Sequence, residues 1–366
     1  LFQLQHHIQK SLPAVNSLPS SGTEEIRPLS IWSPQAGKQI PPQQTGCISP
    51  KFPVTRPTVG PMGRPIALNP FPVKVKCPIN SRTAMPTKFT VIGNDGTNKS
   101  LCRPWGVACD KDGNILIADR SNHRILIYKE DGTFLREFGS RGSELGQFNL
   151  PAGITVDARR RIVVVDKDNH RVQMFTMNGK FLLSFGERGS QCGQFKYPWD
   201  VATNNDCQIA VTDTLNHRIQ LFSPEGVFLR KFGYETNPRM LWVLDSPRGI
   251  AFNPRGDIVT TDFNNHRLVV IDYDFTYADI FECNTGGGET PFLRPQGVVV
   301  DDAGNIIVAD CRNNRVVVLD PSGQLKWTFD CFHHGKETMD RPSGIAITRT
   351  GQIVVVDFGH DRALLF

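Results

Sequence analysis

The sequence predicts an all-β protein, a six-bladed β-propeller that is closed by an N-terminal strand and preceded by a disordered, proline-rich segment. Three observations predict this fold. A proline followed two residues later by Gly or Asp recurs six times, at spacings of 47, 47, 49, 48 and 47 residues. An aspartate and then an arginine follow each proline at nearly constant offsets, and the last repeat lacks one strand. Repeats of about 40–50 residues with four short strands are typical of propeller blades.

Three residues align the six units. The anchor prolines are Pro104, Pro151, Pro198, Pro247, Pro295 and Pro342. The repeated aspartates are Asp119, Asp166, Asp213, Asp262, Asp310 and Asp357. The repeated arginines are Arg124, Arg171, Arg218, Arg267, Arg315 and Arg362. Because all six units stay in register, the pattern specifies a repeat fold rather than a chance motif.

The first unit shows how each blade is built from four strands, which we name a to d. The four strands are expected at residues 106–109, 115–118, 125–128 and 133–138. Strand b is wholly apolar, as expected when both of its faces are buried between neighbouring blades. The turn Asp131-Gly132 is typical of a tight hairpin between strands c and d.

Strand d of the sixth unit is missing, because the sequence stops at Phe366 after strand c. The sequence of residues 89–93 ends in glycine after an apolar strand, as strand d does at Phe138-Gly139 and Phe185-Gly186. We therefore expect residues 89–93 to complete the last blade. Such a closure removes free sheet edges and holds the two ends of the ring together.

Composition divides the chain near residue 87. Residues 1–90 hold 15 of the 26 prolines and ten Lys or Arg against two Glu, which is a net charge of +8. The remainder carries 31 basic and 34 acidic residues, a net charge of −3, and the whole chain therefore has a formal charge of +5. We expect residues 1–86 to be a disordered, basic linker and residues 87–366 to form the propeller.

Several classes of protein are not expected from the composition. No run of 18 or more apolar residues occurs, so we predict no transmembrane helix, and no signal peptide is visible. The nine cysteines are scattered without a C-x-x-C pair, which indicates reduced thiols in the cytosol and no zinc-binding module. The sequence begins at Leu1 rather than Met, so we expect a fragment of a longer protein.

The repeated polar residues are expected to be structural, because one copy per blade places them around a ring and not in one catalytic cluster. We expect each Asp to pair with its Arg, with Asn122, Asn169, Asn216 and Asn265 bonding backbone. For His123, His170, His217 and His266 we expect packing or a surface position rather than metal binding. No catalytic residue, metal or cofactor is predicted. The positions that depart from the repeat include Asp200, Asn314 and Asp361.

A candidate binding site follows from the residues beside the anchor prolines. The connections from strand d to strand a share one face of the ring with the b–c loops, and the flanking residues should surround the channel mouth there. The flanking candidates are Arg103, Trp105, Tyr197, Trp199, Arg248, Arg294 and Arg341, and Arg120, Lys167 and Arg312 follow the repeated Asp on the same face. Arginine suits phosphates and base edges, whereas Trp and Tyr offer faces to unstacked bases.

Structural interpretations of these candidates stay open. Some arginines could pair with nearby acids such as Asp340 or Glu289, and Trp105 and Trp199 could pack one blade against another. The acidic and basic residues of this face are similar in number, so binding would depend on local placement of arginine rather than on a large net field.

Four b–c loops carry the family resemblance. They read Ser-Asn-His-Arg-Ile, Asp-Asn-His-Arg-Val, Leu-Asn-His-Arg-Ile and Asn-Asn-His-Arg-Leu at 121–125, 168–172, 215–219 and 264–268. These motifs resemble NHL repeats, and residues 89–366 are similar to the six-bladed NHL domain of tripartite-motif NHL proteins, closest to the heterochronic, stem-cell regulator branch. The resemblance implies a protein of the cytoplasm and of cytoplasmic RNA granules that binds short mRNA stem-loops and directs repression or decay of developmental mRNAs.

The same resemblance bears on partners and enzymatic activity. It implies RNA as the main partner, protein partners from RNA silencing or decay, no membrane, and a monomeric propeller. The RING, B-box, coiled-coil and filamin-like domains of the family are not recognisable in this sequence, so no ubiquitin ligase activity is assigned to it. Two other classes stay open, a scaffold propeller that docks a protein on the same face and a metal-dependent hydrolase or lyase. An enzyme would need His and carboxylate ligands at the channel, where the sequence supplies arginine and aromatic residues.

Overall fold

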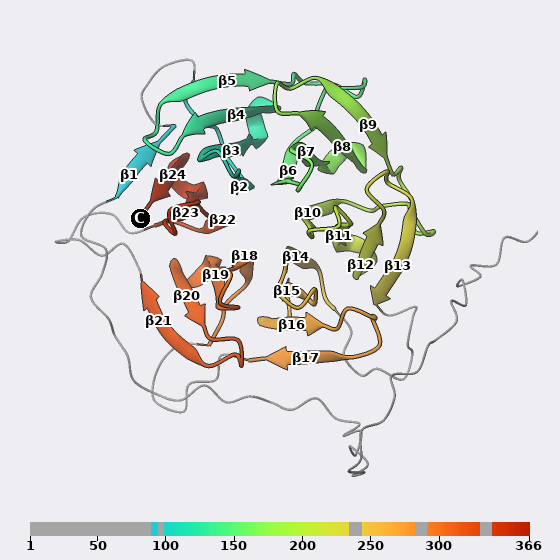
Figure 1. Cartoon of the computed structure of the whole chain (residues 1–366), viewed down its shortest axis with the longest axis vertical. Helices are drawn as coiled ribbons and strands as arrows, with labels where there is room; N and C mark the ends of the chain where they lie inside the picture. The colour runs from blue at the N-terminus through green and yellow to red at the C-terminus, as the bar shows by residue number, and fades with distance from the viewer. Residues whose placement is uncertain (1–88, 94–98, 234–243, 283–290, 330–338) are drawn as a thin grey trace, which may run out of the picture. The chain divides into compact units, whose positions relative to one another are not determined.

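The computed structural model describes residues 89–93, 99–233, 244–282, 291–329 and 339–366. Within these ranges, 24 strands form six four-stranded antiparallel sheets arranged as blades around a centre (Figure 1). This arrangement confirms the predicted six-bladed β-propeller. The predicted linker, residues 1–86, lies outside the described residues, and so does its boundary with the propeller. Both stay predictions. Glu289 also lies outside the described residues.

The strands of each blade run outward from the centre in chain order. Blade one contains β2 (Val107–Cys109), β3 (Asn114–Asp119), β4 (Arg124–Lys129) and β5 (Phe134–Phe138). Blade two contains β6 (Pro151–Val156), β7 (Arg161–Asp166), β8 (Arg171–Thr176) and β9 (Phe181–Phe185). Blade three contains β10 (Pro198–Thr203), β11 (Ile209–Asp213), β12 (Arg218–Phe222) and β13 (Phe228–Gly233).

The other three blades follow the same plan. Blade four contains β14 (Pro247–Phe252), β15 (Ile258–Asp262), β16 (Arg267–Ile271) and β17 (Ala278–Phe281). Blade five contains β18 (Pro295–Val300), β19 (Ile306–Asp310), β20 (Arg315–Leu319) and β21 (Leu325–Phe329). Blade six contains β22 (Pro342–Ile347), β23 (Ile353–Asp357) and β24 (Arg362–Leu365), and its outer strand is β1 (Thr90–Ile92).

Strand β1 closes the ring as the sequence predicts. It pairs antiparallel with β24, with Thr90 opposite Leu365 and Ile92 opposite Ala363 (Figure 1). Ile92 is 1% exposed and packs into the apolar cluster between blades six and one, whereas Val91 points outward and is 43% exposed. The two ends of the propeller are therefore joined in one sheet, which leaves no open interface between the first and last blades.

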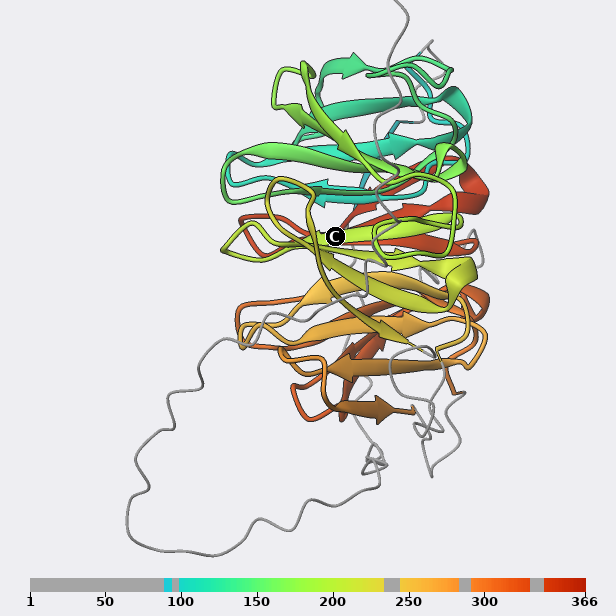
Figure 2. The same ribbon diagram turned by 90° about the vertical axis from the view of Figure 1, so that its right-hand side faces the viewer.

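The ring has two different faces. Five of the six b–c loops form a single turn of 3-10 helix, and these helices gather on one side of the disc in the edge-on view of Figure 2. They are η1 (Arg120–Asn122), η2 (Lys167–Asn169), η3 (Thr214–Asn216), η4 (Cys311–Asn313) and η5 (Phe358–His360). We call this side the b–c face. The opposite side carries the a–b and c–d turns, and we call it the a–b face.

The apolar core is divided among the six interfaces between neighbouring blades. Each interface buries its own cluster of Val, Ile, Leu and Phe side chains, drawn from strands of both blades. Between blades two and three, for example, Met174 and Phe195 pack against Val201 and Phe222. Because both faces of strand b are buried, it is mostly apolar, although blades three and four bury Thr212, Thr260 and Thr261 there.

The centre of the ring is narrow because the a strands approach one another closely. A side-chain carbon placed on Gly106 would lie 2.3 Å from the carbonyl oxygen of Ala152, and one on Gly344 would lie 2.4 Å from that of Trp105. Blade three has Asp200 where the other blades have glycine. Its Oδ1 accepts a hydrogen bond from its neighbour Val201 N at 2.9 Å, and burial raises the pKa of Asp200 to about 7.

The described helices are short. None in that part of the chain is long and apolar enough to cross a membrane.

Candidate functional site

A buried carboxylate organises the b–c loop of every blade. In blade two, Asp166 is fully buried, and its Oδ1 accepts a hydrogen bond from Asn149 N at 2.7 Å. Its Oδ2 accepts from Asn169 Nδ2 and Arg171 Nε, both at 2.8 Å. Burial raises the pKa of Asp166, and these donors oppose that effect. The predicted Asp–Arg pair is therefore present, and it positions the loop that carries the candidate site residues.

The repeated histidines have a role that the sequence analysis missed. Each sits in the left-handed conformation at the end of the b–c turn, with φ of 52–56°. Its Nδ1 accepts a hydrogen bond from the backbone N–H of the residue before the next anchor proline, as in Leu150 N to His123 and Tyr197 N to His170, at 3.2 and 3.1 Å. The histidines therefore join consecutive blades, and they do so as neutral acceptors.

This role explains two of the departures from the repeat. In blade five, Asn314 Oδ1 accepts the same bond from Arg341 N at 2.9 Å. In blade six, Asp361 Oδ1 accepts it from Arg103 N at 2.6 Å, which links the last blade to the first. Asn and Asp tolerate the left-handed conformation and offer an oxygen acceptor, so both preserve the link.

The residues before the anchor prolines have an unusual backbone. All six have φ between 47° and 57°, a region that side chains other than glycine rarely adopt. They are Arg103, Leu150, Tyr197, Ser246, Arg294 and Arg341. The bond from each of their N–H groups to the preceding blade holds this conformation, and it fixes the predicted site residues Arg103, Tyr197, Arg294 and Arg341 on the b–c face.

Aromatic rings line the centre of the b–c face. Trp105 and Trp199 meet edge to face with their centroids 4.9 Å apart, and Trp105 meets Phe358 in the same way at 4.9 Å. Both tryptophans are half-buried and border the narrow channel between the a strands. The alternative that the tryptophans pack blade against blade is thus partly realised, while each keeps an accessible surface.

Arg248 lies between two rings rather than in solvent. Its Cζ is 4.0 Å from the ring centroid of Trp199 and 3.4 Å from that of Phe263, and its Nη1 donates to Gln296 Oε1 at 3.1 Å. Burial lowers the pKa of Arg248 to about 9, so the guanidinium is still charged at neutral pH. It supplies fixed positive charge at the centre of the face.

Lys167 and Arg120 pack on the same rings. Lys167 Nζ lies 5.0 Å from the ring centroid of Tyr197 and 5.4 Å from that of Trp199, it pairs with Asp168, and the residue is only 8% exposed. Arg120 Cζ lies 5.9 Å from the Trp105 ring, and burial lowers its pKa. Six predicted residues thus form one continuous cluster, which we call the aromatic–cation cluster: Trp105, Arg120, Lys167, Tyr197, Trp199 and Arg248.

Three buried donors of this cluster have no hydrogen-bond partner. Within the described residues, four buried side-chain nitrogens lack one, and three of them are Arg120 Nε, Trp199 Nε1 and Arg248 Nε. Buried donors are satisfied in the great majority of cases, so a concentration of unsatisfied donors in one cluster is informative. Because these nitrogens are themselves buried, a ligand would reach them only if the side chains moved, so the accessible surface of the cluster is provided by its rings.

A small hollow opens beside the cluster. It has a volume of about 280 Å³ and is lined by Lys167, Tyr197, Trp199, Thr214, Leu215, Ser246, Arg248 and Asn264. Rings and the Leu215 side chain form its walls, while Ser246 and Asn264 bring polar groups to it. The hollow can accept a flat, partly apolar group.

The remaining predicted arginines lie around the cluster. Arg103, Arg294 and Arg312 are exposed, and Arg294 approaches the Phe263 ring to 5.5 Å. Arg341 pairs with Asp340 at 3.0 Å and lies 5.2 Å from the Phe358 ring, so the acid pairing left open from the sequence is present there. In the described part of the chain, neither Arg103 nor Arg312 lies against one of these rings.

Two site residues escaped the sequence analysis. Phe263 and Phe358 directly follow the repeated aspartates Asp262 and Asp357, the same position that Arg120 and Lys167 occupy in their blades. Comparing that position across all six blades would have identified both. The described residues contain no group of three or more His, Cys, Asp or Glu side chains that could hold a metal ion.

Comparison with known proteins bears first on the fold and then on the family. Solved structures resemble the propeller at low sequence identity. A streptogramin B lyase structure superposes with a TM-score of 0.53 at 14% identity, covering 76% of this chain and 96% of that one. A gluconolactonase of Xanthomonas campestris superposes with a TM-score of 0.52 at 16% identity, covering 72% and 86%. These likenesses concern the fold alone.

The sequence comparison bears on the family. The NHL repeat matches residues 101–128, 148–175, 195–222, 244–271 and 292–319. The rat E3 ubiquitin-protein ligase TRIM71 (Rattus norvegicus) is 54% identical over 69 residues, which is 18% of this chain and 8% of that protein. Protein lin-41 of Caenorhabditis elegans is 46% identical over 44 residues, 12% of this chain and 4% of that protein. These matches support an NHL domain of the kind found in the tripartite-motif NHL proteins, as the resemblance implied.

The extent of these matches is limited. Each aligned segment spans less than a tenth of the relatives' own length. The activities that the relatives' names describe therefore belong to much longer proteins.

Proposed function

We propose that the b–c face binds short mRNA stem-loops and that this binding directs repression or decay of the bound mRNA. The observation that carries the proposal is the aromatic–cation cluster, whose half-buried rings lie beside cations and are surrounded by exposed arginines. RNA loops present unpaired acceptor atoms and unstacked base faces together. Similarity to the tripartite-motif NHL proteins supports a macromolecular partner.

Each part of the face takes a distinct role in this proposal. The rings of Tyr197 and Trp199 and the hollow of about 280 Å³ beside them accept one unstacked base. The exposed Arg103, Arg294 and Arg312 contact phosphates, because a guanidinium can donate two parallel hydrogen bonds to a phosphate. Arg248 stays between its rings and contributes charge rather than a direct phosphate contact.

The proposed action is that of a binding module. It requires no catalytic group from this propeller, and ubiquitin ligase activity would belong to other domains of a longer protein. Since mRNA repression and decay take place in the cytoplasm, we propose that the protein acts there. Protein partners from RNA silencing or decay would carry out the steps that follow RNA recognition.

The proposal is tested with three single substitutions, Arg103→Ala, Arg294→Ala and Arg341→Ala. An RNA selected from a random stem-loop pool serves as the probe, and its dissociation constant is measured at moderate salt. Each substitution should weaken binding by about 1–3 kcal/mol, with the paired Arg341 at the lower end. Arg159→Ala is the matched control, because Arg159 is exposed on the a–b face and should bind RNA as the parent does.

Two outcomes would count against RNA. If all three variants bound the selected stem-loop like the parent, the assignment of this face would be wrong. A pull-down from cell extract separates RNA from a docked protein, because a protein partner held directly by this face should survive nuclease treatment. In that case the scaffold interpretation would replace the RNA interpretation.

A further inference from the structure

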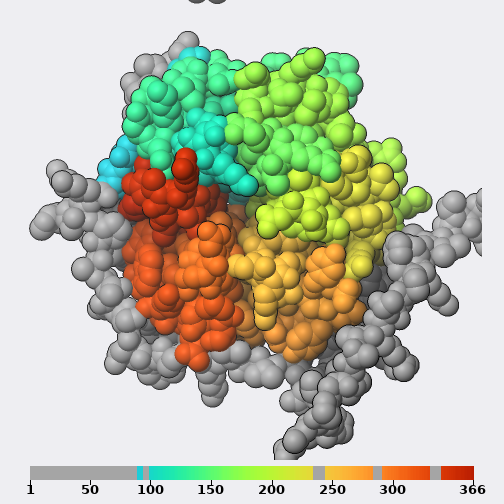
Figure 3. Space-filling view, viewed as in Figure 1, coloured from blue at the N-terminus to red at the C-terminus, as the bar shows by residue number. Residues whose placement is uncertain are grey.

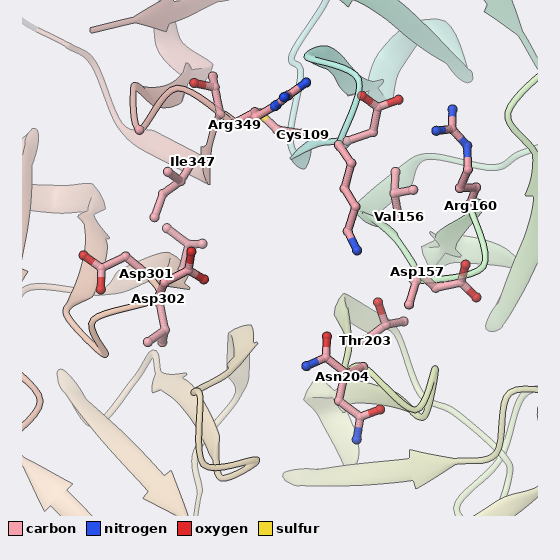
Figure 4. Close-up of a pocket in the computed structure, with 18 of the residues that line it drawn as sticks. Cys109, Val156, Asp157, Arg160, Thr203, Asn204, Asp301, Asp302, Ile347 and Arg349 are labelled. Carbon is pink, nitrogen blue, oxygen red and sulfur yellow. The ribbon is translucent and has the colours of Figure 1, made fainter.

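The a–b face carries three connected cavities that the proposed RNA contacts do not use. The central cavity has a volume of about 930 Å³ and lies at the channel mouth (Figure 3 and Figure 4). A middle cavity of about 510 Å³ shares Asn204 and Asp301 with it. An edge cavity of about 680 Å³ lies between blades four and five. Asp302 lines all three, so the cavities adjoin one another between the centre and the rim, and we call them together the groove.

The edge cavity exists because blade four has smaller residues than blade two at the corresponding positions of the blade interface. In blade two, Met174 on β8 pairs across the sheet with Leu183 on β9. The corresponding pair in blade four is Val270 with Asp279. The pair on the other side of the interface is also smaller. Blade three has Phe222 and Phe228 there, whereas blade five has Leu319 and Leu325. Side chains that fill the interface between blades two and three are thus absent between blades four and five.

The floor of the edge cavity is apolar. Val259, Val270, Phe281 and Ile306 line it, and each is at most 8% exposed. Pro254 and Pro321 stand at its rim and are exposed. The cavity is therefore large enough and apolar enough to take one bulky apolar side chain, which would cover surface that the blades leave open.

Negative charge dominates the middle and edge of the groove. Asp206, Asp279, Asp301 and Asp302 line these two cavities, and the sole basic residue among their lining residues is Arg255. Arg255 is neutralised by Asp257, with 2.9 Å between Nη2 and Oδ2. Asp301 is held within its own turn by Asn305, whereas Asp206 and Asp302 are exposed. A cationic group in the groove would find unneutralised carboxylates beside the apolar pocket.

The central end of the groove carries both signs, because Asp110 and Asp157 line it as well as Asp301, Asp302 and three basic residues. The basic residues are Lys111, Arg160 and Arg349, which come from blades one, two and six and line the same cavity as Asp301 and Asp302. Arg160 pairs with Asp112. Lys111 and Arg349 are exposed. The groove therefore offers an apolar pocket at the rim, exposed carboxylates next to it, and exposed basic side chains only at its central end.

We propose that this groove binds an extended peptide segment of a partner protein. The segment would place an apolar side chain in the edge cavity, a Lys or Arg beside Asp302, and an acidic side chain near Lys111 and Arg349. A linear peptide fits better than a compact ligand, because the three recognition features follow one another along the groove. The site lies opposite the b–c face, so the ring can hold RNA and a protein partner at once. This inference does not rest on RNA binding.

The test uses the full chain of 366 residues and a phage-displayed library of random twelve-residue peptides. We expect enrichment of sequences in which an apolar residue, a basic residue and an acidic residue occur in that order. The double variant Val270→Met/Asp279→Leu restores the blade-two pair and fills the edge cavity, so it should fold normally. It should bind the enriched peptide at least about tenfold more weakly, as expected for loss of an anchor pocket.

A second variant tests the charges. Asp302→Lys should weaken the same peptide about tenfold, and a peptide with Glu in place of its basic residue should regain affinity for this variant. Both groove variants should bind stem-loop RNA like the parent if the b–c face does so, which separates failure of this proposal from failure of the RNA proposal. The peptide site is overturned if no sequence is enriched, if the enriched sequences lack a basic residue, or if the filled variant binds them unchanged.

Discussion

At the residue scale, a single carboxylate in each blade holds together the loop on which the candidate site is built. Asp213 illustrates the cost of removing it. It is fully buried and accepts hydrogen bonds from Lys196 N, Arg218 Nε and Asn216 Nδ2 at 2.7–2.8 Å. Its partner Arg218 is only 3% exposed, so loss of the carboxylate would leave a buried charge without its counter-ion.

We therefore predict that Asp213→Ala lowers the free energy of unfolding by about 3–5 kcal/mol. Urea denaturation followed by tryptophan fluorescence measures the effect as a lower midpoint. The control is Asp206→Ala, because Asp206 is exposed on the a–b face and should change stability by less than about 0.5 kcal/mol. Equal midpoints for the two variants would contradict a structural role for the repeated carboxylate.

The inter-blade histidines make stability depend on pH. Burial, together with the charges of Arg141 and Arg188, lowers the pKa values of His123 and His170. Each must be neutral to accept its backbone hydrogen bond. Since the folded pKa lies below the unfolded value of about 6.5, the unfolded state binds more protons between the two values. The stabilising contribution is complete above about pH 6.5 and is lost as the pH falls through the folded pKa.

We predict that His123→Asn/His170→Asn weakens this dependence, because asparagine accepts the same bond in blade five and does not titrate. Thermal unfolding between pH 7.5 and pH 5 measures the difference. The Tm of the parent should fall further between pH 7.5 and pH 5 than the Tm of the variant. Parallel loss in both proteins would show that the histidines do not titrate with folding.

Some of the site could be predicted from single residues and some could not. The Asp–Arg pairs and the clustering of Trp105 with Trp199 follow from repeat position, because equivalent positions meet around the ring. The acceptor role of His170 and the burial of Arg248 depend on contacts with the next blade, about 30–50 residues away, which one repeat does not reveal. Phe263 was missed because only arginine and lysine were sought at its position.

At the element scale, the short strand β1 has an influence out of proportion to its three residues. Its pairing with β24 fills the outer position of blade six, and the side chain of Ile92 completes the cluster between blades six and one. The strands were predictable because each blade repeats the same alternation of apolar runs and turns. The different filling of the blade interfaces could not be predicted in this way. It depends on which side chains of two neighbouring sheets face each other.

We predict that Ile92→Ala lowers the free energy of unfolding by about 2–5 kcal/mol, as for other fully buried large-to-small substitutions. Val91→Ala lies on the exposed side of the same strand and should cost less than about 0.5 kcal/mol. Chemical denaturation of both variants provides the comparison. A similar cost for the two would mean that β1 contributes through its backbone pairing alone, and not through the cluster that Ile92 enters.

At the scale of the whole molecule, charge is distributed unevenly along the chain. Residues 1–90 carry a net charge of +8, whereas the remaining residues, which include nearly all of the propeller, carry −3. An RNA that approaches the ring therefore meets no general attraction from it, and affinity must come from the few arginines around the aromatic–cation cluster. For a single-stranded ligand, each phosphate contact contributes about −0.7 to the slope of log K against log salt.

With up to four arginine contacts, at Arg103, Arg294, Arg312 and Arg341, residues 87–366 should show a slope of about −3 or shallower. The full chain should show a steeper slope, because its ten basic residues before position 91 add nonspecific phosphate contacts. Arg103→Ala should reduce the slope by about 0.7 in both proteins, since that contact belongs to the ring. Titrations at several salt concentrations measure these slopes. If residues 87–366 and the full chain had identical slopes, the basic segment would make no phosphate contact, and recognition would be confined to the b–c face.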